Sequence, residues 1–304
     1  MTSAPTTVRL RLVDPWLLGV AIVWGSNFAA YKVVLRAVTP LTVVGFRFAL
    51  VTPIFLQAAY FLRGSGVRRP VSWPALVWSG LVVMGSQQII FIYGVSMSTA
   101  YLSALLTSTA PIFTAVIAAL GGQEKLTRLN WAGVALGFGG AATVVLGGRH
   151  EDGGGASSLA VLLLMVSAFL YGYFMVLART IVRDHGGVRA TAWWYLLSCV
   201  LILPLCWHDM AATHWLSLGA TTWFLLAGYI TLLGGALGFL VWYTMVGRIG
   251  SSATAVYQYL VPAVAMITAA LFLGERPEAL QLVGALVTLV GLALSRWPGG
   301  VAGV

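Results

Sequence analysis

Ten long apolar segments, separated by short polar ones, constrain this fold more than any other feature of the sequence. Each is close to the roughly 20 residues that an α-helix needs to cross a bilayer. Only 8% of the 304 residues are charged, against about 25% in a soluble domain, so most of the surface must meet something other than water. We therefore predict an all-α polytopic membrane protein. The expected helices are 15–35, 40–62, 74–95, 99–120, 128–147, 157–178, 190–207, 218–246, 251–273 and 278–297.

The basic residues predict the orientation of these helices. If the N-terminus is cytoplasmic, twelve Lys and Arg residues fall on inner segments and four on outer ones, as the positive-inside rule requires. The net charge of +9 is then a topology signal and not a sign of nucleic-acid binding. We expect both termini in the cytoplasm. Arg47, early in the second helix, is expected to snorkel toward the outer surface.

Two stretches of the chain repeat each other 151 residues apart. The segment PIFTAVIAALGGQEKLTRLNWAG begins at Pro111, and PAVAMITAALFLGERPEALQLVG begins at Pro262. This offset aligns Glu124 with Glu275. Nearer the start of each half, WGSNFAAYK matches YGYFMVLAR at an offset of 147 residues. The repeat therefore extends over most of the chain.

Each half of this repeat contains five of the expected helices, and five is an odd number. The second half therefore enters the membrane from the opposite side, which gives the inverted repeat that many secondary transporters use. We predict a substrate site near the midplane, where the two halves meet. The predicted parts are a cytoplasmic segment 1–14, the first repeat 15–147, a periplasmic linker 148–156, the second repeat 157–297 and a cytoplasmic tail 298–304.

The WGSNFAAYK motif and the duplicated Pro-to-Glu segment resemble the EamA family of the drug/metabolite transporter superfamily. The resemblance covers about residues 15–297 and is closest to the exporters of aromatic amino acids. It implies export or exchange of small metabolites, often amino acids, across a bacterial inner membrane.

The two prolines predict where a substrate cavity lies. A proline within a helix leaves the carbonyl group four residues earlier without its helical partner, here in Thr107 and Gln258. In a membrane, such backbone is tolerated where it lines a wet cavity or is buried in protein. We interpret Pro111 and Pro262 as helix breaks beside a cavity; the alternative is a packing kink whose carbonyls are satisfied by Ser or Thr hydroxyls.

Polar and aromatic side chains at similar depths are the candidate substrate contacts. Polar groups in a membrane usually face the interior of the bundle, although they also hold helices together. For any single residue, both roles stay open. The candidates are Asn27, Gln87, Gln88, Phe91, Tyr101, Thr107, Ser108, Tyr171, Trp242, Tyr257 and Gln258.

Charged residues near the helix ends are interpreted separately. Glu124 and Glu275 each lie in a short turn between two helices, where a carboxylate typically caps or ties helix ends. Lys32 and Arg179 occupy matched positions of the repeat, so we consider them possible gates at the two mouths of the cavity.

The residue types that are missing from the expected helices narrow the function. Glu278, the first residue of the last expected helix, is the only Asp or Glu within these ranges, and the four His residues fall in loops or at an uncertain connection, so none of these groups is expected at mid-membrane. Proton relays depend on such groups, so we favour facilitated movement or exchange. An intramembrane enzyme would need a nucleophile with a base, paired aspartates or a metal motif. We predict no enzymatic activity, no cofactor and no metal site.

An aromatic, amide-rich cavity suits a small neutral or zwitterionic metabolite with an apolar part. The expected function is therefore alternating-access transport of such metabolites, foremost amino acids. The alternatives are proton-coupled drug efflux or nucleotide-sugar-type exchange, and then an intramembrane enzyme or a passive channel. The expected partners are the small-molecule substrate and membrane lipids, with no nucleic acid. The protein is expected to be a monomer or a homodimer.

Overall fold

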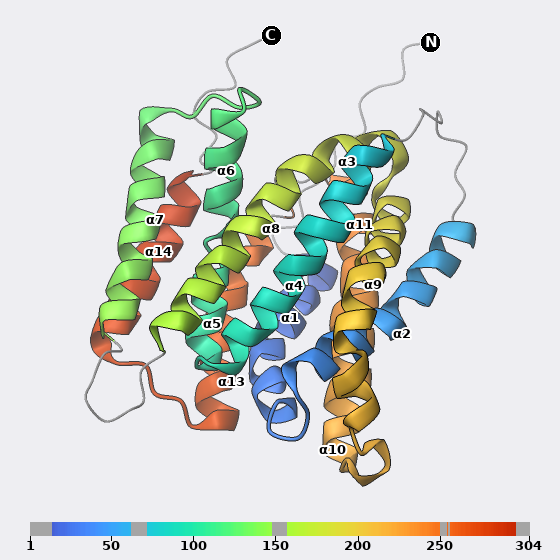
Figure 1. The fold of residues 1–304 in the computed structure, drawn as a ribbon. Helices are drawn as coiled ribbons and strands as arrows, with labels where there is room; N and C mark the ends of the chain where they lie inside the picture. Colours follow the sequence, from blue (N-terminus) through green and yellow to red (C-terminus); the bar gives the residue numbers. More distant parts are fainter. Residues whose placement is uncertain (1–13, 62–71, 148–156, 250–253, 255, 296–304) are drawn as a thin grey trace.

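The computed structural model describes residues 14–61, 72–147, 157–249, 254 and 256–295 (Figure 1). Helices make up nearly all of these residues, and no strand occurs among them. The predicted linker 148–156, the tail 298–304 and all of the N-terminal segment except Asp14 lie outside the described residues. The prediction of an all-α chain is therefore confirmed for the part of the chain that the structure describes.

Eight helical segments of the described chain are long and apolar enough to cross a membrane, and two shorter apolar helices follow them. This confirms the polytopic architecture. The elements are α1 (Pro15–Val34), α2 (Pro40–Phe61), α3 (Trp73–Val77), η1 (Trp78–Met84), α4 (Gly85–Ser96), α5 (Ala100–Thr107), α6 (Ala110–Leu120), α7 (Arg128–Gly147), α8 (Ser158–His185), α9 (Gly187–Ala212), η2 (Trp215–Ser217), α10 (Ala220–Trp223), η3 (Phe224–Leu237), α11 (Gly238–Ile249), η4 (Val256–Tyr259), α13 (Leu260–Leu273) and α14 (Ala279–Ser295).

Local sequence explains where several helices begin and end. The Asp14 carboxylate accepts hydrogen bonds from the backbone N–H groups of Trp16 and Leu17 at 2.9 and 3.3 Å, which caps α1 ahead of Pro15. α8 and α9 are both longer than predicted: α8 continues to His185, and α9 extends from Gly187 to Ala212. Gly186, where φ is 79°, separates the two helices. Glycine adopts this left-handed conformation without steric cost.

The helices pack in pairs that join distant parts of the sequence. α7 packs against α14, α2 against α9 and α1 against α13. The α7–α14 contact is close because glycines face each other: a Cβ atom at Gly140 would lie 2.6 Å from the Gly284 carbonyl oxygen, and one at Gly284 would lie 2.8 Å from the Gly140 carbonyl oxygen. Small residues permit this backbone approach between membrane helices.

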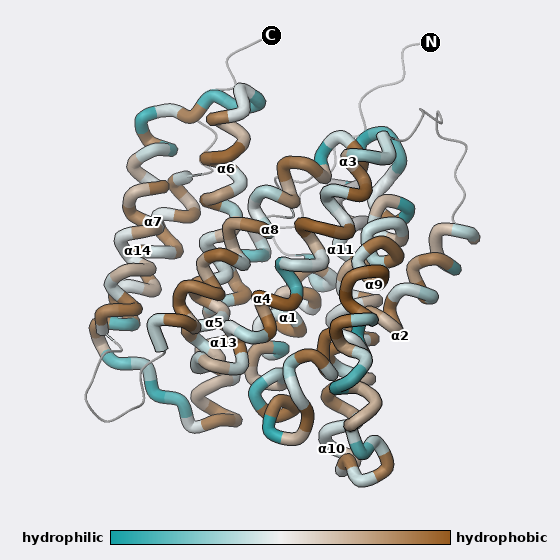
Figure 2. The backbone as a smooth tube through the Cα atoms, viewed as in Figure 1, coloured by the Kyte–Doolittle hydropathy of each residue, from teal (hydrophilic) through white to brown (hydrophobic). Residues whose placement is uncertain are grey.

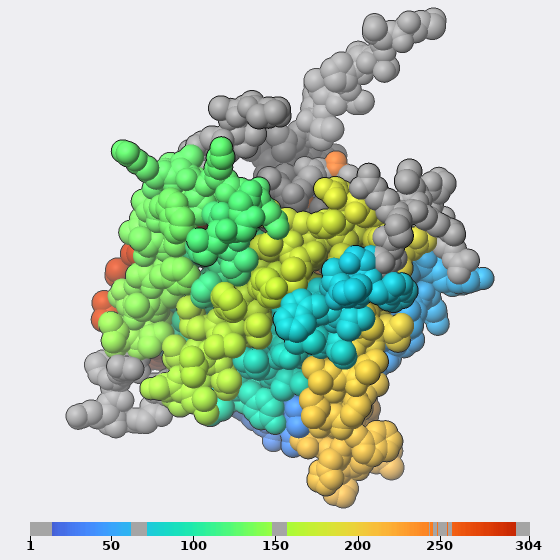
Figure 3. Space-filling view, turned by 45° about the horizontal axis from the view of Figure 1, so that its top comes forward, coloured from blue at the N-terminus to red at the C-terminus, as the bar shows by residue number. Residues whose placement is uncertain are grey.

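The surface of the bundle matches a membrane environment. Hydrophilic residues gather at the two ends, and the helices between them are mostly apolar (Figure 2). Large apolar side chains are exposed along this middle zone, including Leu286 at 64%. In the space-filling view, α8 crosses one face, with α6 and α7 on one side and α3 on the other (Figure 3).

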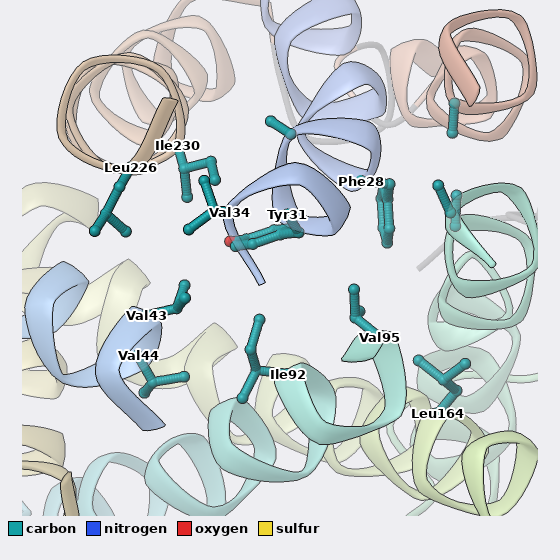
Figure 4. Packing of buried hydrophobic residues seen from close by; sticks show 14 of the residues in the cluster. Phe28, Tyr31, Val34, Val43, Val44, Ile92, Val95, Leu164, Leu226 and Ile230 are labelled. Carbon is teal, nitrogen blue, oxygen red and sulfur yellow. The ribbon is translucent and has the colours of Figure 1, made fainter. Parts of the chain in front are cut away.

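The main core cluster lies in the centre of the bundle. Tyr31 of α1 lies in the middle of the labelled side chains, with Ile92 and Val95 of α4 on one side and Ile230 of η3 on another (Figure 4). This packing fixes α1, α4 and η3 relative to one another.

The backbone departs from regular α-helix beside both repeated prolines and in two further places. α5 ends at Thr107 and α6 begins at Ala110, just before Pro111, and the 3-10 segment η4 immediately precedes α13, which contains Pro262. η1 and η3 are π-helical, a conformation that is rare and often found at functional sites. The sequence analysis did not anticipate these π-helical segments.

Candidate functional site

A cavity of about 230 Å³ lies among α1, α4, α5, α8 and η3, which all contribute residues to its wall. The structure brings eight of the eleven predicted contacts to this wall, together with Pro111. Trp24, Phe28 and Phe239 add aromatic surface. The predicted contacts that border the cavity are Asn27, Gln87, Gln88, Phe91, Thr107, Ser108, Tyr171 and Gln258.

Three predicted contacts lie outside the cavity wall because other helices hold their side chains. The Tyr101 hydroxyl donates to Gln281 Oε1 at 2.9 Å, between α5 and α14. The Tyr257 hydroxyl accepts from the Asp14 backbone N–H at 2.6 Å. Trp242 packs in a small apolar cluster behind Trp24, with the two ring centroids 5.2 Å apart. Pro262 is buried in α13 and is not among the residues that border the cavity.

Arg47 is the main correction to the sequence analysis. Its side chain does not snorkel outward; it turns inward and borders the cavity. Its Nη1 donates to the Tyr31 hydroxyl at 2.5 Å, and its Nη2 donates to Gln88 Oε1. The guanidinium also lies 5.6 Å from the centroid of the Phe48 ring. These neutral oxygens and this ring hold the cation inside the bundle, where α1 and α4 meet α2.

A chain of amide hydrogen bonds continues from this arginine across the cavity wall. Gln88 Nε2 donates to Gln87 Oε1 at 2.7 Å, and Gln87 Nε2 donates to the Ser167 hydroxyl at 2.9 Å. The chain links α2, α4 and α8. Both glutamines therefore hold helices together and also border the cavity. The sequence analysis had treated helix contact and substrate contact as alternative roles.

Two residues of the cavity wall each have a buried polar atom without a hydrogen-bond partner among the described residues. These atoms are Nε of Arg47, which is a donor, and Oδ1 of Asn27, which is an acceptor. Buried polar groups are normally satisfied, so each such atom requires an explanation. None of the described residues that border the cavity is Asp or Glu.

Hydroxyl groups satisfy local backbone at the α5–α6 break. The Thr107 hydroxyl donates to the Ser103 carbonyl at 2.7 Å, and the Ser108 hydroxyl donates to the Leu105 carbonyl at 2.6 Å. This is the arrangement expected of a kink. Because these hydroxyl hydrogens are used, each hydroxyl oxygen can offer a ligand only its lone pairs.

At one end of the bundle, charged groups tie helix ends together. The Glu275 carboxylate accepts from the backbone N–H groups of Ala100 and Tyr101 at 2.9 and 3.2 Å, so it caps α5, as expected. Lys32 Nζ donates to the carbonyl groups of Ser98 and Ser96 at 2.6 and 3.2 Å, at the end of α4.

Arg179, near the end of α8, forms an ion pair with Glu124, which follows α6, with 2.6 Å between Nη1 and Oε1. These ends of α6 and α8 lie at the opposite end of the bundle (Figure 1). The Arg179 and Glu124 side chains are 39% and 40% exposed. The two predicted gate residues therefore lie at opposite ends of the bundle and have different partners: backbone carbonyls for Lys32 and a carboxylate for Arg179.

Several residues of the cavity wall were not among the predicted contacts, and the polar ones and the glycines of η3 matter most for the site: Tyr31, Arg47, Ser167, Gly234 and Gly235. Gly234 and Gly235 border the cavity, and the Gly234 carbonyl accepts from Trp24 Nε1 at 3.0 Å. A charged residue within an apolar helix is itself a signal of function, so Arg47 could have been identified. No sequence signal marked the π-helical backbone.

The chain matches known transporters over most of its length. A model of the EamA-like transporter family matches residues 11–146 and again residues 158–297. A probable terminal-alkyne amino-acid exporter from Streptantibioticus cattleyicolor is 27% identical over 92% of each chain. A probable amino-acid metabolite efflux pump from Escherichia coli is 28% identical over 91% of this chain and 94% of the relative. A crystal structure with 18% identity covers 92% of this chain and 95% of its own, with a TM-score of 0.64, and shares the fold.

Proposed function

Because this chain belongs to the EamA-like transporter family, we propose that it exports or exchanges amino acids and related small metabolites by alternating access. Family membership makes it a multi-pass membrane transporter and not an enzyme. The observation that carries the proposal is the cavity that α1, α4, α5, α8 and η3 enclose. Its aromatic rings suit an apolar side chain, and its amides suit polar groups.

The internal symmetry of the chain supports two inverted five-helix repeats. The family model matches the chain twice, and the close glycine contacts between α7 and α14 are reciprocal. The π-helical segments η1 and η3 belong to the third and eighth expected helices, which correspond in the two halves. Two similar halves can exchange conformations, so that the cavity opens alternately to each side.

Contacts at the two ends of the bundle would break and form when the two halves exchange conformations. Glu275 and Lys32 hold α4 and α5 at one end. The exposed Glu124–Arg179 pair lies at the other end. With both termini in the cytoplasm, the Glu275 end faces outward, and the arrangement is then that of a transporter closed toward the outside. The proposed location is the bacterial inner membrane.

The charges in the cavity separate this proposal from the alternatives. A nucleotide sugar carries several negative charges and would require several cations, whereas Arg47 is the only cation among the described residues of the wall. A cationic drug would require a carboxylate, and the described wall contains none. The substrate gradient is therefore the proposed driving force, without obligatory proton coupling.

Counterflow in proteoliposomes tests the proposal. Liposomes that contain the pure protein are loaded with one unlabelled amino acid, and uptake of the labelled form is measured across a panel of amino acids. We expect saturable uptake of apolar and aromatic members, reduced roughly ten-fold in affinity by Gln258→Ala at the cavity. Leu286→Ala, on the exposed apolar surface, is the matched control and should transport like wild type. No counterflow of any amino acid, or uptake that rises linearly with concentration, would contradict the proposal.

A further inference from the structure

The charge of the cavity is not balanced. Arg47 is the only charged side chain among the described residues of the wall, and no described Asp or Glu forms an ion pair with it. Tyr31 and Gln88 offer it only neutral oxygens. A buried charge without a counter-charge is unfavourable, so the described wall carries one positive charge that a ligand can neutralise.

The guanidinium also retains hydrogen-bonding capacity. Arginine has five N–H donors in a planar fork, and Nε of Arg47 is buried without a partner among the described residues. Carboxylates match this fork in charge and geometry and form strong charge-assisted hydrogen bonds with it. The missing partner of Arg47 is therefore best supplied by a carboxylate.

A second unsatisfied atom defines the other polar contact. Oδ1 of Asn27 is a buried acceptor to which no described residue donates, and Asn27 borders the same cavity. Either an ammonium group or an amide N–H can donate to it. An ammonium group would bring a second positive charge into a wall without carboxylates, whereas an amide N–H would satisfy Asn27 without adding charge.

We propose that the cavity binds a small organic monoanion, with its carboxylate on Arg47, one N–H group on Asn27 and its apolar body against the aromatic rings. An N-acylated amino acid has this chemistry. The inference rests on the proposed function and narrows its substrate class: the net charge of −1 neutralises Arg47, which a zwitterion does not do.

This assignment has an energetic consequence for transport. A substrate with a net charge of −1 is driven outward by a membrane potential that is negative inside. At −100 mV the potential alone supports an outward accumulation of about 50-fold. A zwitterion carries no net charge and gains nothing from the potential.

Leucine and three of its derivatives separate the effect of the carboxylate from that of the ammonium group in one experiment. Leucine is the zwitterion, N-acetylleucine the anion, leucinamide the cation and N-acetylleucinamide the neutral compound. Binding to the purified protein is measured by the shift of its unfolding temperature over a concentration series. We expect N-acetylleucine to bind at least ten-fold more tightly than each of the other three.

Substitutions of Arg47 test its role directly. Arg47→Gln should weaken N-acetylleucine at least ten-fold and leave N-acetylleucinamide unchanged. Arg47→Lys keeps the charge without the planar fork, so it should still prefer the anion, at reduced affinity. This variant provides the test of Arg47 if Arg47→Gln does not fold. Equal binding of leucine and N-acetylleucine, binding of none of the four, or an unchanged preference in Arg47→Gln would overturn the inference.

Transport of the same compounds keeps the two proposals distinguishable. In proteoliposomes, uptake of N-acetylleucine should respond to an imposed potassium diffusion potential, and uptake of leucine should not. If the protein binds N-acetylleucine selectively but transports none of the compounds, the proposed function fails and the binding inference stands. If leucine and N-acetylleucine are both transported, with equal affinity, the inference fails and the proposed function stands.

Discussion

Replacing Glu275 by Gln should loosen the end of the bundle that this carboxylate holds closed. Glu275 accepts two backbone hydrogen bonds, at 2.9 and 3.2 Å, from the first residues of α5. Hydrogen bonds to a charged group contribute about 1.5–3 kcal/mol each, against about 0.5–1.5 kcal/mol for neutral ones. The amide keeps one neutral acceptor, so the expected loss is about 1–2 kcal/mol after allowance for partial exposure.

This loss acts on the balance between the closed and open states of that end. If the contacts exist only in the closed state, about 1–2 kcal/mol shifts the equilibrium roughly 5- to 30-fold toward the open state. Spin labels at the exposed positions Met97 and Leu280 report the distance across this end by double electron–electron resonance. We expect a second, longer distance population in Glu275→Gln.

The opposite end of the bundle supplies a matched control. Glu124→Gln makes the same chemical change in an ion pair whose side chains are 39% and 40% exposed. Exposed pairs contribute about 0–1 kcal/mol, so the populations should shift less than about five-fold and in the opposite direction. An unchanged distance distribution in a folded Glu275→Gln protein would refute the assignment of Glu275 to closure.

Three further predictions follow from the packing and the charges. Gly140→Ala places a Cβ atom 2.6 Å from the Gly284 carbonyl oxygen and should lower the free energy of unfolding by about 1–3 kcal/mol. Gly139→Ala meets no atom of the described residues within 4 Å and should not lower it, and thermal unfolding of the purified variants compares the two. Gly234→Ala overlaps the Asn27 amide group and should impair counterflow, whereas Gly235→Ala, with its nearest neighbour at 3.4 Å, should be tolerated. An imposed pH gradient alone should drive no concentrative uptake, because no described Asp or Glu borders the cavity.

The helices could be predicted from the sequence because their cause is local. An apolar run of the length of a bilayer must satisfy its own backbone, and a helix does so. The start of α1 is also determined locally, because the Asp14 side chain caps the first N–H groups of the helix and Pro15 occupies its first position. The end of α8 was less predictable, since helical backbone continues beyond the apolar run to Gly186.

Residue type also predicted much of the cavity wall. Amide groups such as Gln87 and Gln88 are costly in contact with lipid, so they lie inside the bundle. The direction of a side chain depends instead on helices that are distant in sequence. Tyr101 turns to Gln281 and Tyr257 to Asp14, and neither partner can be identified from spacing along the chain.

Arg47 shows the same limit more clearly. Its depth in the helix permits snorkelling, and only the placement of Tyr31 and Gln88 on neighbouring helices explains why it turns inward. The π-helical segments η1 and η3 show a related limit: both contain glycine, which weakens a regular α-helix, but glycine does not specify a π-helix.

The most direct test of the account asks whether substrate passes through this cavity. Ser108, which borders it, is replaced by Cys in a protein whose free Cys199 and Cys206 are replaced by Ala, and a charged methanethiosulfonate reagent is applied to proteoliposomes. The account predicts that modification abolishes saturable transport and that saturating substrate slows the modification. Wild-type transport by fully modified protein would contradict it.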